Sequence, residues 1–452
     1  MEPHPIRMVV GDDLERSRLT VFFRLLLAIP HIIWLLLWGI AVFFVAILSW
    51  FIVLFTARLP EGLHAFSAAY VRYGTHVYGF LLLAANPFPG FTGAEGSYPV
   101  DVEIDPPARQ SRWKTAFRII LVFPAFLITT ALMGGWGPGG GSSTTTDGSE
   151  EYYYWGGSAG LAFSIAFFAW FACMVRARMP NGFRDALAYA LRYAAQTYGY
   201  LLFLTDRYPH ADPRQNPVPA PPPPRPIALT ADEDLHRSRL TVFFRLLLAI
   251  PHFIWLILWS IPVVFVLIVG WIAAIILGRF PDPFHRFVGA YLRYSIHLFA
   301  FVSLVANPFP GFTGTPGTYP VDLQIDPPER QNRWTIAFRS LLVFPAIAVE
   351  SALSGVLLIA AFLGWFAAMA TGRMPAGFRS LGEWALGYYG QSYGYLYLLT
   401  GRYPYSGPPA LDVPELVAET EPTGPTEPGS WPETTAPPGS WPEPPPPPSF
   451  SS

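Results

Sequence analysis

The sequence predicts an all-α polytopic membrane protein with four quasi-repeated segments. Three observations lead to this prediction: an apolar composition, long runs without charge, and internal repetition. Hydrophobic residues make up 52% of the chain and charged residues only 13%, whereas a typical soluble domain has about 25% charged residues. The formal net charge of −2 offers no basic excess for nucleic acid, so no nucleic-acid partner is expected.

Internal repetition defines the domains. The phrase RSRLTVFFRLLLAIPH begins at Arg16 and again at Arg237. The same offset relates most of the two halves, so we expect two tandem membrane repeat domains, 1–207 and 227–402. Each half repeats again more weakly, because four segments share the pattern arginine, five residues, arginine, five residues, proline. These segments open at Arg18, Arg112, Arg239 and Arg333.

The length of the apolar runs predicts helical hairpins. The run from Arg18 to Arg58 would form about 60 Å of helix, twice the roughly 30 Å of a hydrocarbon core. A second run is cut at Gly134 by an insertion rich in Gly, Ser and Thr. We therefore expect about eight transmembrane spans, and Glu350 should fall in a turn between two of them. The four transmembrane helical hairpins are placed at 18–58, 112–178, 239–279 and 333–373.

The distribution of basic residues predicts the orientation. Lys and Arg are absent from the stretches 31–57, 119–175, 252–278 and 340–372. Because basic residues favour the cytoplasmic side, the hairpin bases, the connections and both the N- and C-termini should be cytoplasmic. The insertion should be external. The chain is thus expected to be a multi-pass protein of the cell membrane.

Each hairpin is followed by a mixed segment of about twenty residues. In the first of these, Tyr73 and Phe80 share one face of a helical wheel while Arg72 and His76 share another. This pattern predicts interfacial amphipathic helices, with a third span per quarter as the alternative. Glutamine stands at the matching position to His76 in two quarters, which favours a hydrogen-bonding role for this position.

Short polar stretches before each quarter predict cytoplasmic β-strands. In 98–105, apolar and acidic residues alternate with the period of a half-buried strand. Four such stretches could pair in one small sheet. Asp105 followed by two prolines also predicts a helix N-cap, and Asp326 repeats the pattern.

Two proline-rich stretches have too few apolar residues for a core. Residues 208–226 are predicted to be a stiff linker and residues 403–452 a disordered cytoplasmic tail. A protein partner with an aromatic groove could bind the tail, and an unrecognised solvated tail is the alternative.

The repeated N-terminal phrase, the NPFPGF segment at 86–91, and the YPVD motif resemble an uncharacterised bacterial membrane family, domain of unknown function 4389. The resemblance covers most of both halves and implies two tandem copies of that domain. It brings no known reaction, ligand or catalytic residue. The proline-rich, arginine-heavy and lysine-poor composition is similar to that of actinobacterial proteins.

The candidate site residues are arginines that could form a set of similar cationic sites for anionic lipid or phosphate. The alternative is that they anchor helix ends by snorkelling. Two groups are considered, the second arginine of each quarter and the arginines of the mixed segments. They are Arg24, Arg118, Arg245, Arg339, Arg72, Arg192 and Arg293.

Catalysis has little support in the sequence. A phosphate-binding glycine loop, a metal-spaced His/Glu cluster and a serine elbow are all missing, so we expect no enzyme, cofactor or metal. The single cysteine, Cys173, forms no disulfide within the chain. The predicted function is a non-enzymatic membrane scaffold or a lipid-interacting organiser, and the alternative is a channel or transporter for a small solute.

Overall fold

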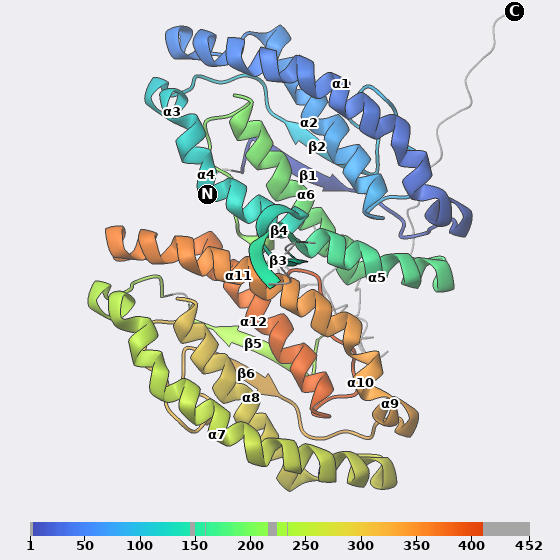
Figure 1. Ribbon diagram of the computed structural model, residues 1–452, viewed down its shortest axis with the longest axis vertical. Coiled ribbons are helices and arrows are strands. Elements are labelled where there is room, and N and C mark those ends of the chain that lie inside the picture. Colours follow the sequence, from blue (N-terminus) through green and yellow to red (C-terminus); the bar gives the residue numbers. More distant parts are fainter. Residues whose placement is uncertain (1–2, 145–149, 159, 216–223, 233, 410–452) are drawn as a thin grey trace, which may run out of the picture. The chain divides into compact units, whose positions relative to one another are not determined.

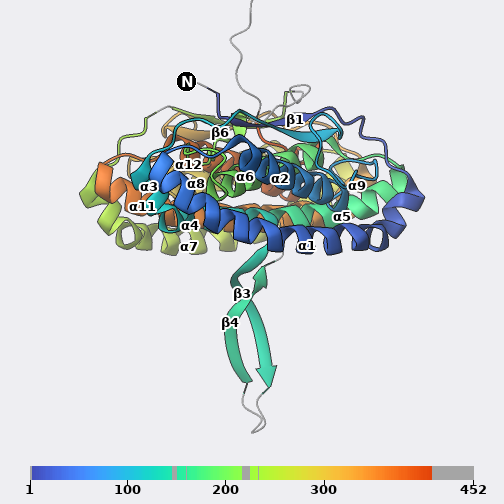
Figure 2. The same cartoon turned by 90° about the horizontal axis from the view of Figure 1, so that it is seen from above.

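The computed structural model describes residues 3–144, 150–158, 160–215, 224–232 and 234–409, with the backbone alone for 135–158. The described part is mostly helical and contains three small sheets. Its elements lie in three layers (Figure 2). Apolar helices, among them the longest ones, form one layer, which we call the long-helix layer. Four helices of 21 residues form the middle layer, and two small sheets with their loops form the third.

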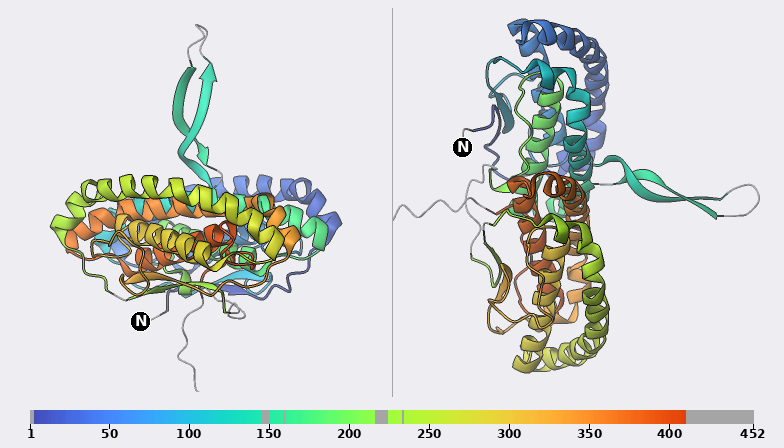
Figure 3. Two further views of the ribbon diagram at one scale, coloured as in Figure 1. Left: turned by 90° about the horizontal axis from the view of Figure 1, so that it is seen from below. Right: turned by 90° about the vertical axis from the view of Figure 1, so that its left-hand side faces the viewer.

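The first layer contains the most apolar segments of the chain, which lie side by side (Figures 1 and 3). Its longest members, α1 and α7, have 39 residues each. The helices of this layer are α1 (Arg18–Thr56), α4 (Arg118–Met133), α5 (Gly160–Arg176), α7 (Arg239–Leu277) and α11 (Phe344–Thr371), with short helices α3 (Arg112–Ala116), α9 (Arg333–Ala337) and α10 (Arg339–Leu342) leading into them.

The hairpins predicted at 18–58 and 239–279 are wrong, because each stretch is one continuous helix. The α1 stretch after Pro30 has no cluster of turn-forming residues, so nothing in it favours breaking the backbone hydrogen bonds. The helix ends only at Ala57, which has a positive φ of 58°. The hairpins were predicted from the length of the apolar run, but a helix can continue beyond the thickness of a bilayer.

The segments 112–178 and 333–373 also lack a fold-back. Helices α4 and α5 follow one another end to end (Figure 1). The two strands β3 (Gly135–Thr144) and β4 (Glu150–Ser158) leave and return between them. A Cβ at Gly160 would lie 2.1 Å from the Gly134 backbone nitrogen, so the helix ends meet closely. In the second half, α11 passes through the matching stretch without interruption, and Glu350 therefore lies inside a helix and not in a turn.

Three of the described helices are long and apolar enough to cross a membrane, judged by length and composition alone. They are α1, α7 and α11. Helices α4 and α5 are apolar but shorter. These helices are fewer than the eight predicted spans. Each predicted hairpin is either one continuous helix or, for α4 and α5, two helices placed end to end.

The four mixed segments form the middle layer, and each is a helix of 21 residues. Their positions and their two faces match the sequence prediction, but they do not lie at an exposed interface. Long helices cover one side of this layer and the sheets cover the other (Figure 2). The middle helices are α2 (Glu61–Leu81), α6 (Asn181–Leu201), α8 (Asp282–Val302) and α12 (Ala376–Leu396).

The predicted strands form two separate sheets and not one. Strand β1 (Ile6–Val10) pairs antiparallel with β2 (Val100–Ile104), and β5 (Ile227–Ala231) pairs with β6 (Val321–Ile325). Each sheet therefore closes within its own half. The β3–β4 ribbon leaves the long-helix layer on the side opposite to these sheets (Figure 2).

The predicted caps at Asp105 and Asp326 are wrong, because the helices begin later. Helix α3 is capped by Ser111, whose side chain accepts a bond from the Lys114 N–H. Asp105 instead accepts hydrogen bonds from Arg7 across the first sheet.

The halves are joined by the segments that follow α6 and α12. The Tyr405 hydroxyl donates to Asp185 Oδ2 at 2.7 Å, and Arg214, in the 3-10 helix η1 (Pro213–Gln215), donates to Ser380. Residues 404–408 are thus part of the packed structure, although the sequence assigns them to the tail. The rest of the predicted tail, 410–452, and linker residues 216–223 lie outside the described residues.

Candidate functional site

Arg24 connects α1 to the end of α2. Its side chain is only 2% exposed. Its Nη1 donates to the carbonyl of Phe80 and, at 2.9 Å, to that of Ala85. The guanidinium carbon also lies 4.4 Å from the centre of the Phe80 ring. The carbonyl end of a helix attracts a positive charge, so this buried cation is stabilised by α2.

The same connection occurs in all four quarters. The second arginine of each quarter donates to two carbonyls at the end of the neighbouring 21-residue helix. The matching pairs of acceptors are Tyr200 and Thr205 for Arg118, Phe301 and Ala306 for Arg245, and Tyr395 and Thr400 for Arg339.

An unusual backbone conformation accompanies each arginine. The turn after each middle helix contains a bulky residue with positive φ, between 63° and 68°, a region that Leu and Phe rarely adopt. The turn directs carbonyl groups towards one guanidinium, and charge-assisted hydrogen bonds offset the strain. The four residues are Leu83, Phe203, Leu304 and Leu398.

A second side chain, not predicted from the sequence, binds each of these turns. Arg16 is 2% exposed and donates to the carbonyls of Leu83 and Ala84. In the second quarter Gln110 takes this place, donating to Phe203 and accepting a bond from Arg118. The available signal was the spacing, because an Arg or Gln precedes the opening arginine by two residues in every quarter. Arg237 and Gln331 complete the set.

The other predicted arginines face the third layer. Arg72 donates from Nε to the Val102 carbonyl at 2.9 Å and forms an ion pair with Glu95. Arg293 donates to Leu323 in the same way, and Arg192 donates to the Asp212 carbonyl at 2.7 Å. The fourth quarter has Gly387 at this position. The structure therefore distributes the seven predicted arginines over separate internal positions and does not gather them on one surface. Lipid or anion binding by them stays a prediction.

A histidine and an aspartate join α2 and α8 to their sheets. His76 Nε2 lies 2.6 Å from Asp101 Oδ1, and His297 lies 2.9 Å from Asp322 Oδ1. Burial alone would raise the pKa of Asp101, but hydrogen bonds from His76 and from the N–H groups of Val102 and Gly96 outweigh it. The pKa of Asp101 is therefore lowered.

Glutamine occupies the matching position in α6 and α12. Gln196 donates to the Ile6 carbonyl at 3.0 Å and accepts a bond from the His210 N–H. Gln391 accepts a bond from the Tyr405 N–H. All four side chains at this position are hydrogen-bonded, as the sequence predicts, although the glutamines and the histidines have different partners.

One acidic side chain lies inside the long-helix layer. Glu350 of α11 is 6% exposed, and its Oε1 accepts a bond from the Ser354 hydroxyl at 2.6 Å. A buried carboxyl group among apolar helices is uncommon and is often functional.

Potential metal ligands do not cluster in the described part of the chain. No group of three or more His, Cys, Asp or Glu side chains is placed there to hold a metal ion. Cys173 is buried, and its sulfur lies 3.9 Å from that of Met179.

Four segments of the chain match one family model. The model named domain of unknown function (DUF4389) matches residues 18–92, 156–211, 239–313 and 333–406. These segments cover more than half of the chain. The chain belongs to the DUF4389 family. Each DUF4389 match contains one middle helix and the turn with its left-handed residue. Neither the curated proteins nor the solved structures provide a match to the chain.

Proposed function

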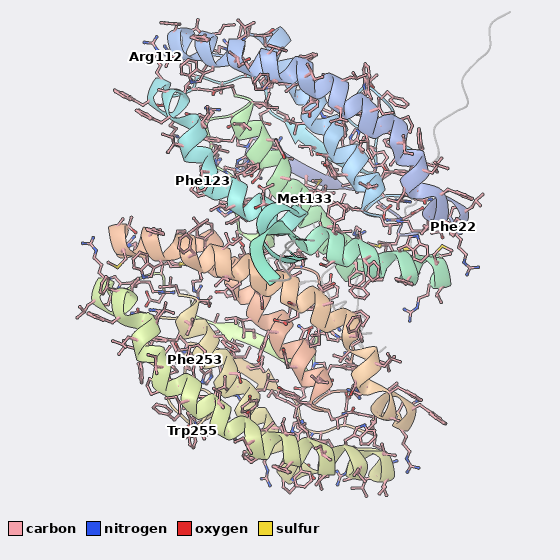
Figure 4. The ribbon with its side chains drawn as sticks, viewed as in Figure 1. Phe22, Arg112, Phe123, Met133, Phe253 and Trp255 are labelled. Atoms are coloured by element: carbon pink, nitrogen blue, oxygen red, sulfur yellow. The ribbon has the colours of Figure 1, made fainter. Side chains whose placement is uncertain are left out.

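We propose that this DUF4389 protein is a non-enzymatic membrane organiser that interacts with lipids through its layer of long helices. The observation that carries the proposal is the apolar outer side of that layer. Leu25 is 75% exposed, Leu246 69% and Phe265 66%. The outward side chains labelled in Figure 4 include Phe22, Phe123 and Trp255. A continuous apolar surface of this kind is unfavourable in water and is typical of membrane contact.

The layer geometry favours helices that lie in the plane of the bilayer. Helix α1 has 39 residues, which corresponds to about 58 Å, and its exposed side chains are apolar along nearly its whole length. A crossing orientation would leave roughly half of that length outside a core of about 30 Å. Placing the layer parallel to the membrane covers all of these side chains at once. The multi-pass arrangement predicted from sequence is the competing orientation.

The exposed basic residues support a position at the inner surface of the cell membrane. They lie at the ends of the long helices, as Arg112 does in Figure 4, where their side chains could reach anionic headgroups. In this proposal, headgroup contact belongs mainly to the exposed arginines, and the buried ones hold the layers together. The first-layer arginines that are exposed include Arg18, Arg58, Arg112, Arg239 and Arg333.

The four family segments are proposed to be two tandem copies of one unit, 1–207 and 227–402. The arginine connections support this arrangement, because Arg24 and Arg245 bind carbonyls at matching positions. The proline-rich tail remains a proposed site for a protein partner.

Membrane washing tests the proposal. Membranes from cells that express the full chain are washed with alkaline carbonate, and we expect the protein to stay in the pellet. A variant with Leu246→Glu and Phe265→Glu should be released, whereas the surface control Thr92→Glu should not. Release of the unchanged protein would contradict membrane embedding. Flotation with vesicles that contain or lack phosphatidylglycerol tests the lipid preference. Arg58→Gln combined with Arg178→Gln, which lies at a further exposed position beside α5, should weaken that preference.

A channel or transporter is the second candidate, and the buried Glu350 favours it. Purified protein in liposomes should then conduct protons or a small solute without any partner. The Glu350→Gln variant should abolish that flux. Tight liposomes that contain correctly inserted protein would count against transport.

A further inference from the structure

A cavity of about 740 Å³ lies in the first half of the molecule. Helices α1, α4 and α5 of the outer layer line its sides, and α2 and α6 of the middle layer line its floor. Met133, labelled in Figure 4 at the end of α4, is one of the lining residues. The volume lies in the range of about 300 to 1,000 Å³ that is common for small-molecule sites.

The cavity borders the apolar outer surface. Leu36 of α1, Phe126 of α4 and Phe163 of α5 line it and are also exposed. On the floor, Tyr78 and Tyr198 are 41% and 43% exposed although they belong to the middle layer. A ligand could therefore enter from the side of the long helices.

The residues that line the cavity suit an uncharged ligand. None of the lining residues is an acid, a base or a histidine. The hydroxyl groups of Thr75, Thr129 and Thr130 already donate to carbonyls of their own helices. Among the described residues, the hydroxyls of Tyr78 and Tyr198 have no hydrogen-bond partner, so they remain free to bind an ester or hydroxyl oxygen of a ligand.

The second half places aromatic rings where the first half has space. Ala194 on α6 matches Tyr389 on α12, since each lies two residues before a glutamine. The Tyr389 ring lies 4.4 Å from the Tyr393 ring and 5.3 Å from that of Phe299. Tyr393 and Phe299 correspond to the two floor tyrosines, and both are less exposed than these. The tyrosine thus occupies the position that the alanine leaves open.

We infer that the cavity of the first half binds the hydrocarbon chain of a membrane lipid, which enters laterally between α1 and α4. The inference rests on the proposed function, because the opening meets lipid only if the outer layer is embedded. It adds a specific site to that function and makes the two halves functionally unequal. One half holds a lipid chain and the other is closed by its own side chain.

Photolabelling tests the site. The full chain is reconstituted in vesicles of phosphatidylcholine and phosphatidylglycerol that include a phosphatidylcholine with a diazirine on its acyl chain. After irradiation, mass spectrometry locates the labelled residues. We expect label on Tyr78 and Tyr198 in the unchanged protein, its loss in Ala194→Tyr, and new label on Phe299 and Tyr393 in Tyr389→Ala.

The outward residue Leu25 separates the two possible failures. If Leu25 is labelled but the floor tyrosines are not, the membrane proposal stands and the lipid site is refuted. If Leu25 is not labelled either, the membrane proposal itself fails. Equal labelling of Tyr78 and Tyr198 in the unchanged protein and in Ala194→Tyr would also overturn the site, because the added ring should exclude the chain. Thermal unfolding of each variant confirms that it is folded.

Discussion

Ala194 and Tyr389 occupy the same position on two middle helices, α6 and α12, and a phenol ring is the difference between them. Tyr389 packs 4.4 Å from Tyr393, whereas Ala194 borders a cavity of about 740 Å³. The two halves therefore share a backbone arrangement but not an interior.

This difference predicts how the first half tolerates a large side chain. Ala194→Tyr should change the free energy of unfolding by less than about 1 kcal/mol, because the cavity has room for the ring. Ala190→Tyr, on the same helix but fully buried, should cost about 1 to 3 kcal/mol through overpacking. Denaturation of both variants in one detergent makes the comparison, and equal losses would contradict an open cavity.

Removing a buried arginine should weaken the connection between layers. Arg24→Gln and Arg245→Gln each leave two helix-terminal carbonyls without a charged donor, and we expect a loss of about 1.5 to 3 kcal/mol in unfolding free energy. Arg58→Gln, at an exposed position, is the matched control and should change little. Thermal unfolding measures all three variants. Unchanged stability in Arg24→Gln would show that the buried guanidinium is dispensable.

The buried Asp101 should make the sheet connection sensitive to acid. Its lowered pKa means that the folded state favours the ionised carboxylate. The stabilisation of the folded state by the ionised Asp101 is complete above the usual carboxyl pKa of about 3.9. It is lost as the pH falls towards the lower pKa of Asp101 in the folded state. Asp101→Asn should flatten the pH dependence of the melting temperature below about pH 4. An identical pH profile in the variant would contradict the assignment.

Cysteine labelling decides the orientation. Cys173 is replaced by serine, and single cysteines are placed at Ser143 in β3 and at Thr92 in the loop after α2. A membrane-impermeant maleimide should label Ser143→Cys in intact cells and Thr92→Cys only after lysis, because the distribution of basic residues predicts an external insertion and a cytoplasmic loop after α2. Labelling of both positions from one side would refute the proposed orientation.

Two truncations should locate the start of the tail. Removing residues 410–452 leaves every described contact in place, so the melting temperature should stay the same. Removing residues 404–452 also deletes Tyr405, which bonds Asp185 in the other half at 2.7 Å, and should lower it by several degrees. Equal melting temperatures would mean that the Tyr405 segment adds no stability.

The sequence predicted the repeat, the helical character and the two faces of the middle helices. These features follow from local patterns: repeated arginine and proline spacing, apolar runs, and the placement of Arg72 and His76 on one face. It was wrong about the hairpins at 18–58 and 239–279, because apolar composition specifies a helix but not whether that helix crosses a bilayer or lies along it.

Only the tertiary structure revealed how the arginines are used. Spacing placed Arg24 near a helix end, yet its acceptors lie more than fifty residues later in the chain, at a turn that forms when Leu83 adopts a left-handed conformation. The cavity was also invisible to sequence, because its volume depends on side chains from five helices that meet only after folding. Local patterns fixed which segments are helices, and the packing of distant side chains decided which charges are buried and where space remains.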